Sequence, residues 1–167
     1  MLKPIDSAVV IRDGGAVGHH PGQIHEGVGW WLGACLVVTA KTPRLAVAHD
    51  GRPVSIAFAD RLCRGAINAQ HYACTVRFLG SRPEPELLAA ASAFDAPAAW
   101  VSTKPAGDAD TVRIRLYNLN GVLLDETNGL AVIRDLIERD RVPIPVNDQA
   151  KGQVVIWPPV TSQGAHP

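Results

Sequence analysis

Short apolar segments alternate with longer amphipathic segments along most of this chain, and this alternation limits its fold more than any other feature. Residues 45–48 read LAVA, a strand without a polar position, which is typical of a sheet covered on both faces. Behind it, apolar residues recur at helical spacing from Ser55, a helix-capping residue type, to Asn68. We therefore expect an α/β protein, a three-layer αβα sandwich with a mixed β-sheet.

The same patterns assign most of the remaining chain. About four main strands are expected to form the sheet. Further strands are predicted at 7–11, 73–79, 98–102 and 111–117, with 122–124 returning after the Asn120-Gly121 hairpin signal. Helices are predicted over 24–38, 86–94 and 127–139, and loops over 15–22 and 103–110. Residues 1–141 are expected to form one domain, and 142–167 a proline-rich tail with one strand at 153–157.

One strand has two different faces. In residues 111–117 (TVRIRLY), Val112, Ile114 and Leu116 alternate with polar or charged residues. The apolar set is expected in the core, so Arg113, Arg115 and Tyr117 belong to a solvated face or a cleft.

Charge and segment lengths exclude several classes of protein. The 167 residues hold 16 Lys+Arg and 16 Asp+Glu, a formal net charge of 0, so we expect no nucleic-acid partner. The longest apolar uncharged stretch, Gly27–Ala40, is shorter than the roughly 20 residues of a membrane-spanning helix, so no membrane partner is expected. Cys35, Cys63 and Cys74 lie in apolar segments and are read as buried free thiols. Together these features predict a cytoplasmic protein.

Four segments, in order, resemble the first domain of the α-D-phosphohexomutases, the phosphomannomutase/phosphoglucomutase superfamily. VIRDG (10–14) is similar to the opening YDIRG segment of that family, and LAVAHDGRPVS (45–55) to its VVVGRDTRxSS stretch. FLGSRPEPE (78–86) stands where the family has a G-x-x-PTP turn. WVSTKP and VRIRLYNLNG resemble TASHNP and NGIKLYGPNG. The resemblance extends from about residue 7 to residue 140.

The resemblance implies a site around Ser102, which matches the serine that the family phosphorylates beside Mg²⁺. Lys104 is a second catalytic candidate, and Mg²⁺ is expected only if Ser102 is phosphorylated. The candidates for binding substrate or a small anion are Arg12, Asp50, Arg52, Thr103 and Arg115.

The departures from the family pattern point away from mutase chemistry. Thr103 and Lys104 replace the family's His and Asn, and Arg115 replaces a general acid/base Lys. Arginine keeps its proton at accessible pH, so it can bind phosphate but cannot shuttle a proton. The family's metal, sugar and phosphate loops have no counterpart in residues 1–167. Asp108 and Asp110 are the only close aspartate pair, and we expect them to be solvated rather than to bind metal.

Two functions therefore stay open. The first is a stand-alone domain that binds a small anion or sugar phosphate, or a partner, without mutase activity. The second is an enzyme: a phosphoserine-type phosphotransferase completed by a partner chain, or a different reaction in the same cleft. The cations near Ser102 either form an anion site or are neutralised by Asp13, Asp50, Asp108 and Asp110.

Self-association is also expected. A lone copy of such a domain would expose apolar surface, so we expect a homodimer or a hetero-partner. Trp30 or Trp31 and the proline-rich tail are the candidate contacts.

Overall fold

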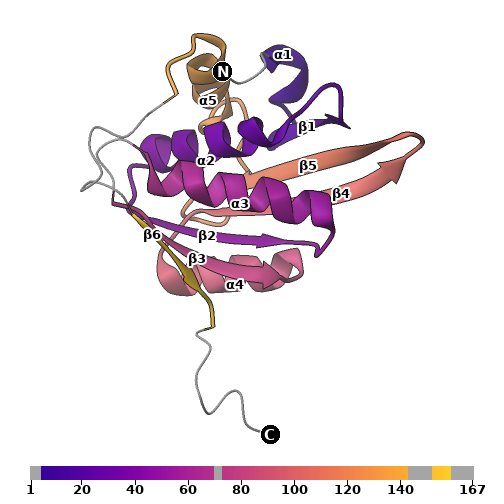
Figure 1. The fold of residues 1–167 in the computed structure, drawn as a ribbon. Helices are drawn as coiled ribbons and strands as arrows, with labels where there is room; N and C mark the ends of the chain where they lie inside the picture. The colour runs from indigo at the N-terminus through magenta and orange to yellow at the C-terminus, as the bar shows by residue number, and fades with distance from the viewer. Residues whose placement is uncertain (1–4, 70–72, 143–151, 159–167) are drawn as a thin grey trace, which may run out of the picture.

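The computed structural model describes residues 5–69, 73–142 and 152–158 (Figure 1). Its helices are α1 (Ser7–Val10), α2 (Glu26–Ala40), α3 (Pro53–Ile67), α4 (Glu84–Phe94) and α5 (Leu130–Glu138). Its strands are β1 (Gly15–His20), β2 (Arg44–His49), β3 (Thr75–Ser81), β4 (Ala98–Ala106), β5 (Ala109–Tyr117) and β6 (Gln153–Ile156).

The strands form one mixed sheet between two layers of helices. The strand order is β1-β5-β4-β2-β3-β6, with β1, β5 and β4 antiparallel and β4, β2, β3 and β6 parallel. Helices α2 and α3 lie side by side on one face, and α4 packs on β2 and β4 from the other (Figure 1). The αβα sandwich is confirmed, with six strands in the described residues instead of about four.

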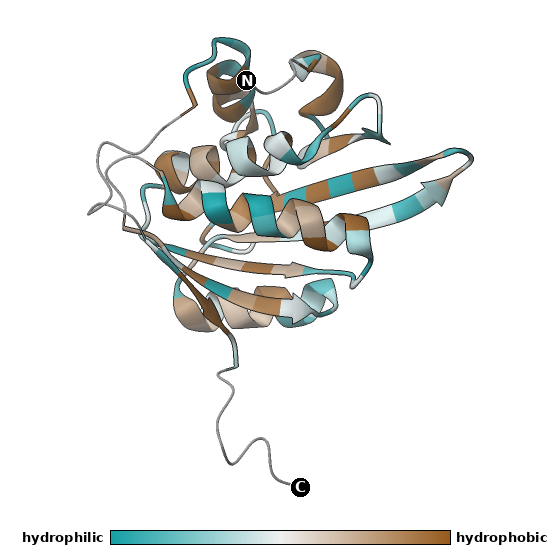
Figure 2. Ribbon diagram, viewed as in Figure 1, coloured by the Kyte–Doolittle hydropathy of each residue, from teal (hydrophilic) through white to brown (hydrophobic). Residues whose placement is uncertain are grey.

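The predicted two-faced strand is β5. Val112, Ile114 and Leu116 are fully buried in the core beneath α2 and α3. The strand alternates between brown and teal in Figure 2, because Arg113 and Arg115 belong to the opposite face. The core prediction for this strand is confirmed, but Tyr117, predicted on the solvated face or in a cleft, is buried in the core cluster beneath α4.

Glycines allow α2 and α3 to approach each other closely. A Cβ atom on Gly33 would lie 2.0 Å from the Leu62 carbonyl oxygen, and one on Gly65 would lie 1.9 Å from that of Trp30. Contacts of this length are sterically forbidden, so these positions accept only glycine without a shift of the helices. The expected amphipathic helix at 24–38 is apolar on nearly all sides, since α3 and α5 pack against it and its remaining residues join the core over the sheet.

Two predictions near the N-terminus are wrong. In the segment 7–11, Ser7–Val10 form α1 instead of a strand, because Val9 and Val10 donate backbone hydrogen bonds to the Asp6 carbonyl. Residues 15–20, predicted as a loop, form β1, antiparallel to β5. A short apolar run does not distinguish strand from helix, and glycines and histidines are weak strand formers that only the neighbouring strand orders.

Three further boundaries differ from the predictions. Residues 103–110 form the end of the β4–β5 hairpin rather than a loop, and the return strand at 122–124 is reduced to a single bridge between Tyr117 and Leu123. The last long helix begins at Leu130, because Asp125 accepts the backbone hydrogen bonds of the preceding turn. The N-cap residue of α3 is Arg52, and Ser55 lies within the helix.

The C-terminal segment contributes β6, parallel to β3, at the edge of the main sheet. The rest of the predicted tail, 143–151 and 159–167, lies outside the described residues. Among the described helices, none combines the length and apolar character that crossing a membrane requires. The three cysteines are buried and free, as predicted.

Candidate functional site

Ser102 lies inside β4, not at the end of a strand. It is paired with Arg113 of β5, and the hairpin continues past it to Ala106. Successive side chains in a strand point to opposite faces. Because Val101 and Thr103 face α3, Ser102 belongs with Trp100 and Lys104 on the face that carries α4.

Thr103 belongs to a buried polar network on the other face. Its hydroxyl oxygen lies 2.5 Å from that of Ser55, in the first turn of α3. Its backbone N–H donates to Oδ2 of Asp50, the residue that follows β2, over 2.9 Å. Asp50 Oδ1 accepts a second hydrogen bond, from the backbone N–H of Arg52. The network ties the strand of Ser102 to the end of β2 and the start of α3.

These contacts act on the charge of Asp50. Partial burial raises the pKa of this carboxyl, but the Thr103 and Arg52 N–H groups, the Ser55 hydroxyl and the Arg52 charge outweigh it, so the pKa is lowered. The neighbouring His49 has a lowered pKa because burial disfavours its charged form, although the Asp50 charge opposes this. Asp50 is thus an ionised carboxylate that holds the backbone, and its negative charge repels an anion.

A second group of candidate residues lines a hollow of about 630 Å³ beside β1 and β5. Arg12, Arg113 and Arg115 all contribute to its wall, together with Asp13 and Glu126. Arg12 is paired with Asp13. Arg115 Nε lies 3.1 Å from Oε2 of Glu84 in the first turn of α4. The sequence therefore identified two of the three arginines of this hollow.

The structure divides the predicted site residues into separate groups. Asp50, Arg52 and Thr103 meet at the start of α3, whereas Arg12 and Arg115 meet at the hollow. Three of the four predicted cations have acidic partners: Arg12 with Asp13, Arg52 with Asp50, and Arg115 with Glu84. The partner of Arg115 is not one that the sequence suggested.

Arg113 is a further candidate that the motif comparison missed. Within the part of the chain that the structure describes, the side chains of Arg113 and Lys104 have neither an ion pair nor a hydrogen bond. Arg113 is opposite Ser102, and Lys104 is two residues farther along β4 on the same face. The alternation of residues 111–117 already placed Arg113 beside Arg115, so the signal was present in the sequence.

The residues around Ser102 do not fit Mg²⁺, which requires oxygen ligands. Its neighbours on this face are the cationic Arg113 and Lys104, and the Asp50 network belongs to the other face. Asp108 lies in the hairpin turn and Asp110 pairs with His20 of β1. In residues 5–69, 73–142 and 152–158, no three His, Cys, Asp or Glu side chains gather as a metal site would require.

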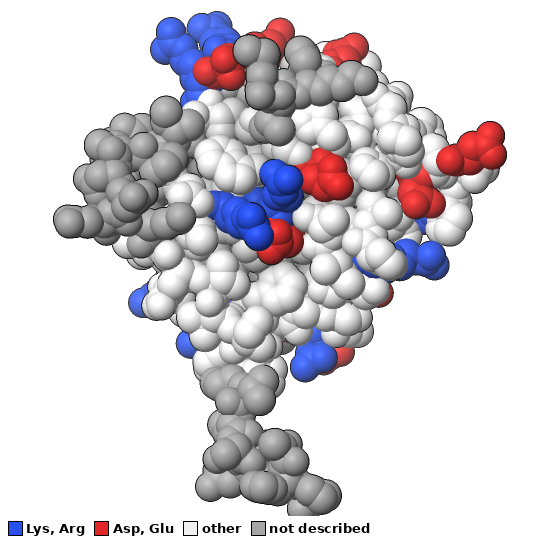
Figure 3. Space-filling model, viewed as in Figure 1, with Lys and Arg blue, Asp and Glu red and all other residues white. Residues whose placement is uncertain are grey.

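Trp30 and Trp31 are both half-buried against the main core, and the Trp31 ring meets that of His25 edge to face. On the face formed by α2 and α3, positive and negative side chains lie next to each other (Figure 3). One such pair joins Arg64 to Asp60 within α3.

Comparison with known proteins supports the fold. No family model and no curated protein matches the sequence. A phosphoglucomutase/phosphomannomutase family protein from Burkholderia thailandensis superimposes with a TM-score of 0.68 at 16% identity, over 92% of this chain and 33% of its own. This chain has a phosphohexomutase-type fold. A candidate phosphomannomutase from Thermus thermophilus gives a TM-score of 0.66 at 18% identity, over 94% of this chain and 34% of its own. The chain thus spans about a third of the length of these phosphohexomutase-type neighbours.

Proposed function

We propose that this chain binds a small anion of the phosphate or sugar-phosphate class at the face of the β4–β5 hairpin, without mutase activity of its own. The observation that carries the proposal is the position of Ser102, opposite Arg113 and two residues from Lys104, two cations without an acidic partner among the described residues. A hydroxyl donor beside two cations suits a tetrahedral anion.

The chemistry of the two cations favours phosphate over other anions. The planar guanidinium of Arg113 can donate two parallel hydrogen bonds to phosphate oxygens, and Lys104 adds a mobile point charge. Arg113 also borders the hollow shared with Arg12 and Arg115, which leaves room for the sugar of a sugar phosphate. The Asp50–Ser55–Thr103 network would act indirectly, by fixing the strand that carries Ser102.

Several features count against phosphoryl transfer as the main activity. Phosphoryl transfer relies on positioned metal ions or cations and on a group that moves a proton. Arg115 cannot transfer a proton, and its guanidinium forms an ion pair with Glu84. Ser102 is held within a paired strand, where its backbone has little freedom to follow a reacting group.

Calorimetric titration with inorganic phosphate and with hexose phosphates tests the proposal. We expect dissociation constants tighter than about 1 mM, weakened roughly fivefold, or ~1 kcal/mol, by Arg113→Ala and by Lys104→Ala. Arg61→Ala is the matched control, because Arg61 is an exposed arginine on α3 without an ion pair in the described structure. Binding weaker than millimolar, or equal loss in the control, would reject the proposal.

The second candidate function is acceptance of a phosphoryl group by Ser102. One observation favours it: in the described residues the Ser102 hydroxyl has no hydrogen-bond partner, and it lies opposite a free guanidinium. Intact mass after incubation with glucose 1,6-bisphosphate and Mg²⁺ distinguishes the two functions. A gain of one phosphate that Ser102→Ala abolishes would support the enzyme, and an unchanged mass together with calorimetric binding would support the binding protein.

A further inference from the structure

The edges of the sheet are protected to very different degrees. The outer strand β1 is largely buried, and the following turn folds back so that Gln23 and Ile24 donate backbone hydrogen bonds to His19. Where β4 extends past β2, its free edge carries Lys104 and Pro105, which oppose strand pairing. The β1 edge and the free part of β4 are therefore both protected against pairing with another strand.

The edge formed by β6 has no such protection. Its sequence, QVVI, contains no charge and no proline. Val154 is 40% exposed and Ile156 is 55% exposed, and both belong to the face of α3. In Figure 2 most of this strand is coloured as hydrophobic. An apolar, uncharged edge strand is the kind that pairs with another strand.

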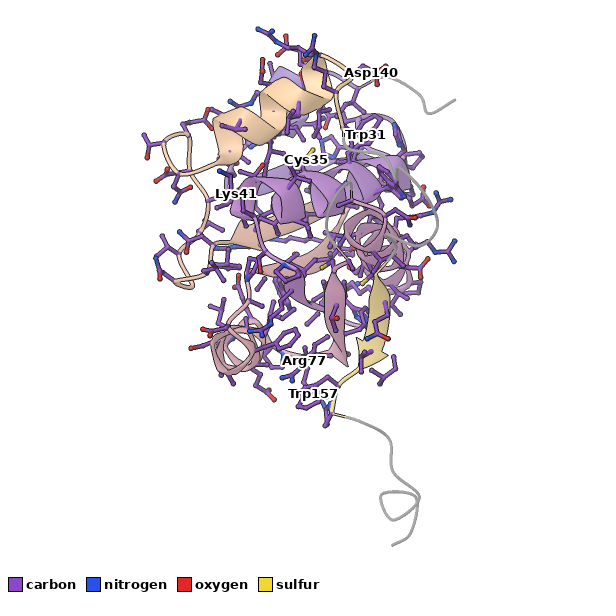
Figure 4. All side chains as sticks on the ribbon, turned by 90° about the vertical axis from the view of Figure 1, so that its left-hand side faces the viewer. Trp31, Cys35, Lys41, Arg77, Asp140 and Trp157 are labelled. Atoms are coloured by element: carbon purple, nitrogen blue, oxygen red, sulfur yellow. The ribbon has the colours of Figure 1, made fainter. Side chains whose placement is uncertain are left out.

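β6 is held firmly to the rest of the sheet at both of its ends. Before it, Gly152 approaches Cys74 so closely that a Cβ atom would lie 1.9 Å from the Cys74 carbonyl oxygen. After it, the Trp157 backbone N–H donates to Phe78. The guanidinium of Arg77 is stacked between the rings of Trp157 and Phe94, 3.8 Å from each ring centre (Figure 4). The free edge is therefore presented in a fixed conformation.

The backbone pattern shows which groups point outward. Gln153 and Trp157 donate their N–H groups to β3, so in a strand that alternates by residue the odd-numbered positions face β3. The N–H and C=O groups of Val154 and Ile156 consequently point away from the sheet. Among the described residues, no strand pairs with β6 on that side.

We propose that this edge pairs with the β6 edge of a second copy of the chain, antiparallel and about a two-fold axis through Val155. In that register each Val154 lies opposite the partner's Ile156, and the two residues exchange both of their backbone hydrogen bonds. The side chains of these residues share one face, so they also cover each other. Because the strand is uncharged, no like-charge repulsion opposes a second copy. The inference is independent of the proposed anion site.

Sedimentation velocity over about 5 to 200 µM protein measures the association. We expect a monomer–dimer equilibrium whose dissociation constant rises about tenfold or more in Val154→Lys, since a lysine at the edge opposes pairing. The control is Val132→Lys, a similarly exposed valine on α5. A wild-type chain that is monomeric throughout, or a Val154→Lys variant that dimerises as tightly as the wild type, would overturn the proposal.

A cross-linking experiment tests the register itself. Val155 is the only β6 residue that meets its own copy on the axis, with Cα atoms about 4.5 Å apart, within the range that disulfides span. Under mild oxidation Val155→Cys is expected to give a covalent dimer and Val154→Cys far less, while the buried native cysteines do not compete. Equal cross-linking of both variants, or of neither, would contradict the two-fold pairing.

Discussion

The side-chain hydroxyls of Ser55 and Thr103 lie 2.5 Å apart and join the first turn of α3 to β4 at the point where β2 has already ended. Ser55 is fully buried and Thr103 nearly so. Beyond this point β4 has lost its parallel neighbour, and the Asp50 carboxylate takes over by accepting the Thr103 N–H. The two hydroxyls and one carboxylate therefore replace a strand in holding the segment of Ser102.

Thr103→Val tests this role, since it keeps the shape of the side chain and removes the hydroxyl. The Ser55 hydroxyl then loses Thr103 but keeps Asp50 as a partner, so one buried hydrogen bond is lost, which costs about 0.5–1.5 kcal/mol. We expect a loss of that size in the free energy of unfolding in urea. Thr111→Val is the control, because the Thr111 hydroxyl makes only an exposed 3.4 Å contact with His19. A loss in Thr103→Val no greater than in the control would show that the network contributes nothing to stability.

Patterns in the sequence predicted the elements whose apolar periodicity lies in their own residues. The apolar positions of α3, apart from the exposed Ile56, and the alternation of β5 carry the periodicity of their own structures, so their buried faces were predicted. The stripe predicted for α2 is only part of its buried surface, because the helix is covered on nearly all sides. β1 and the outer part of the β4–β5 hairpin were missed, because each is a strand only by virtue of the strand beside it. Pro105 and Gly107 indeed look like loop residues when read alone.

The sequence also identified several residues of the candidate site, but not their ion pairing. Motif comparison identified Ser102 and Arg115, and alternation placed Arg113 on the same face. Ion pairing between distant segments, such as Arg115 with Glu84, depends on how α4 packs over the sheet. For that reason the sequence could not say which cations would stay unpaired.

The close approach of α2 and α3 gives a second prediction. Gly33→Ala would force a methyl group into the Leu62 carbonyl, and the two helices would have to separate. We expect a loss of about 3 kcal/mol or more in unfolding free energy, at the upper end of overpacking effects. Gly80→Ala is the comparison, because Gly80 has φ +76° but nothing within 4 Å of its Cβ position, so only backbone strain of roughly 1 kcal/mol applies. Equal losses in the two variants would mean that the helices adjust without cost.

A third prediction concerns stability in mildly acidic solution. Burial holds the pKa of His49 below its ordinary value of 6.5, so the unfolded chain binds a proton there before the folded chain does. Stability is therefore full above pH 6.5 and falls as the pH drops below it. A further loss follows below pH 3.8, where Asp50, whose folded pKa is lowered, is protonated first in the unfolded chain.

His49→Asn separates this effect from those of the other histidines. An asparagine oxygen can replace Nδ1 of His49 as acceptor for the Gly51 N–H, so the fold is preserved. The drop in unfolding free energy between about pH 7.5 and about pH 5.5 should shrink in this variant and persist in the control His19→Asn, whose side chain is exposed. An unchanged drop in His49→Asn would assign the acid sensitivity to another group.

The last prediction concerns the three buried thiols. Burial raises the pKa of Cys35, Cys63 and Cys74 to about 12 each, from an ordinary value of 9.0. Because the thiolate is the reactive form, the folded protein at about pH 8 should react with a thiol reagent only as fast as it unfolds. Raising the pH above 9.0 ionises these thiols in the unfolded chain first, so stability is lost progressively toward pH 12. Reaction of all three thiols in urea is the control, and reaction of any thiol in the native protein at the rate of free cysteine would show that its site opens without global unfolding.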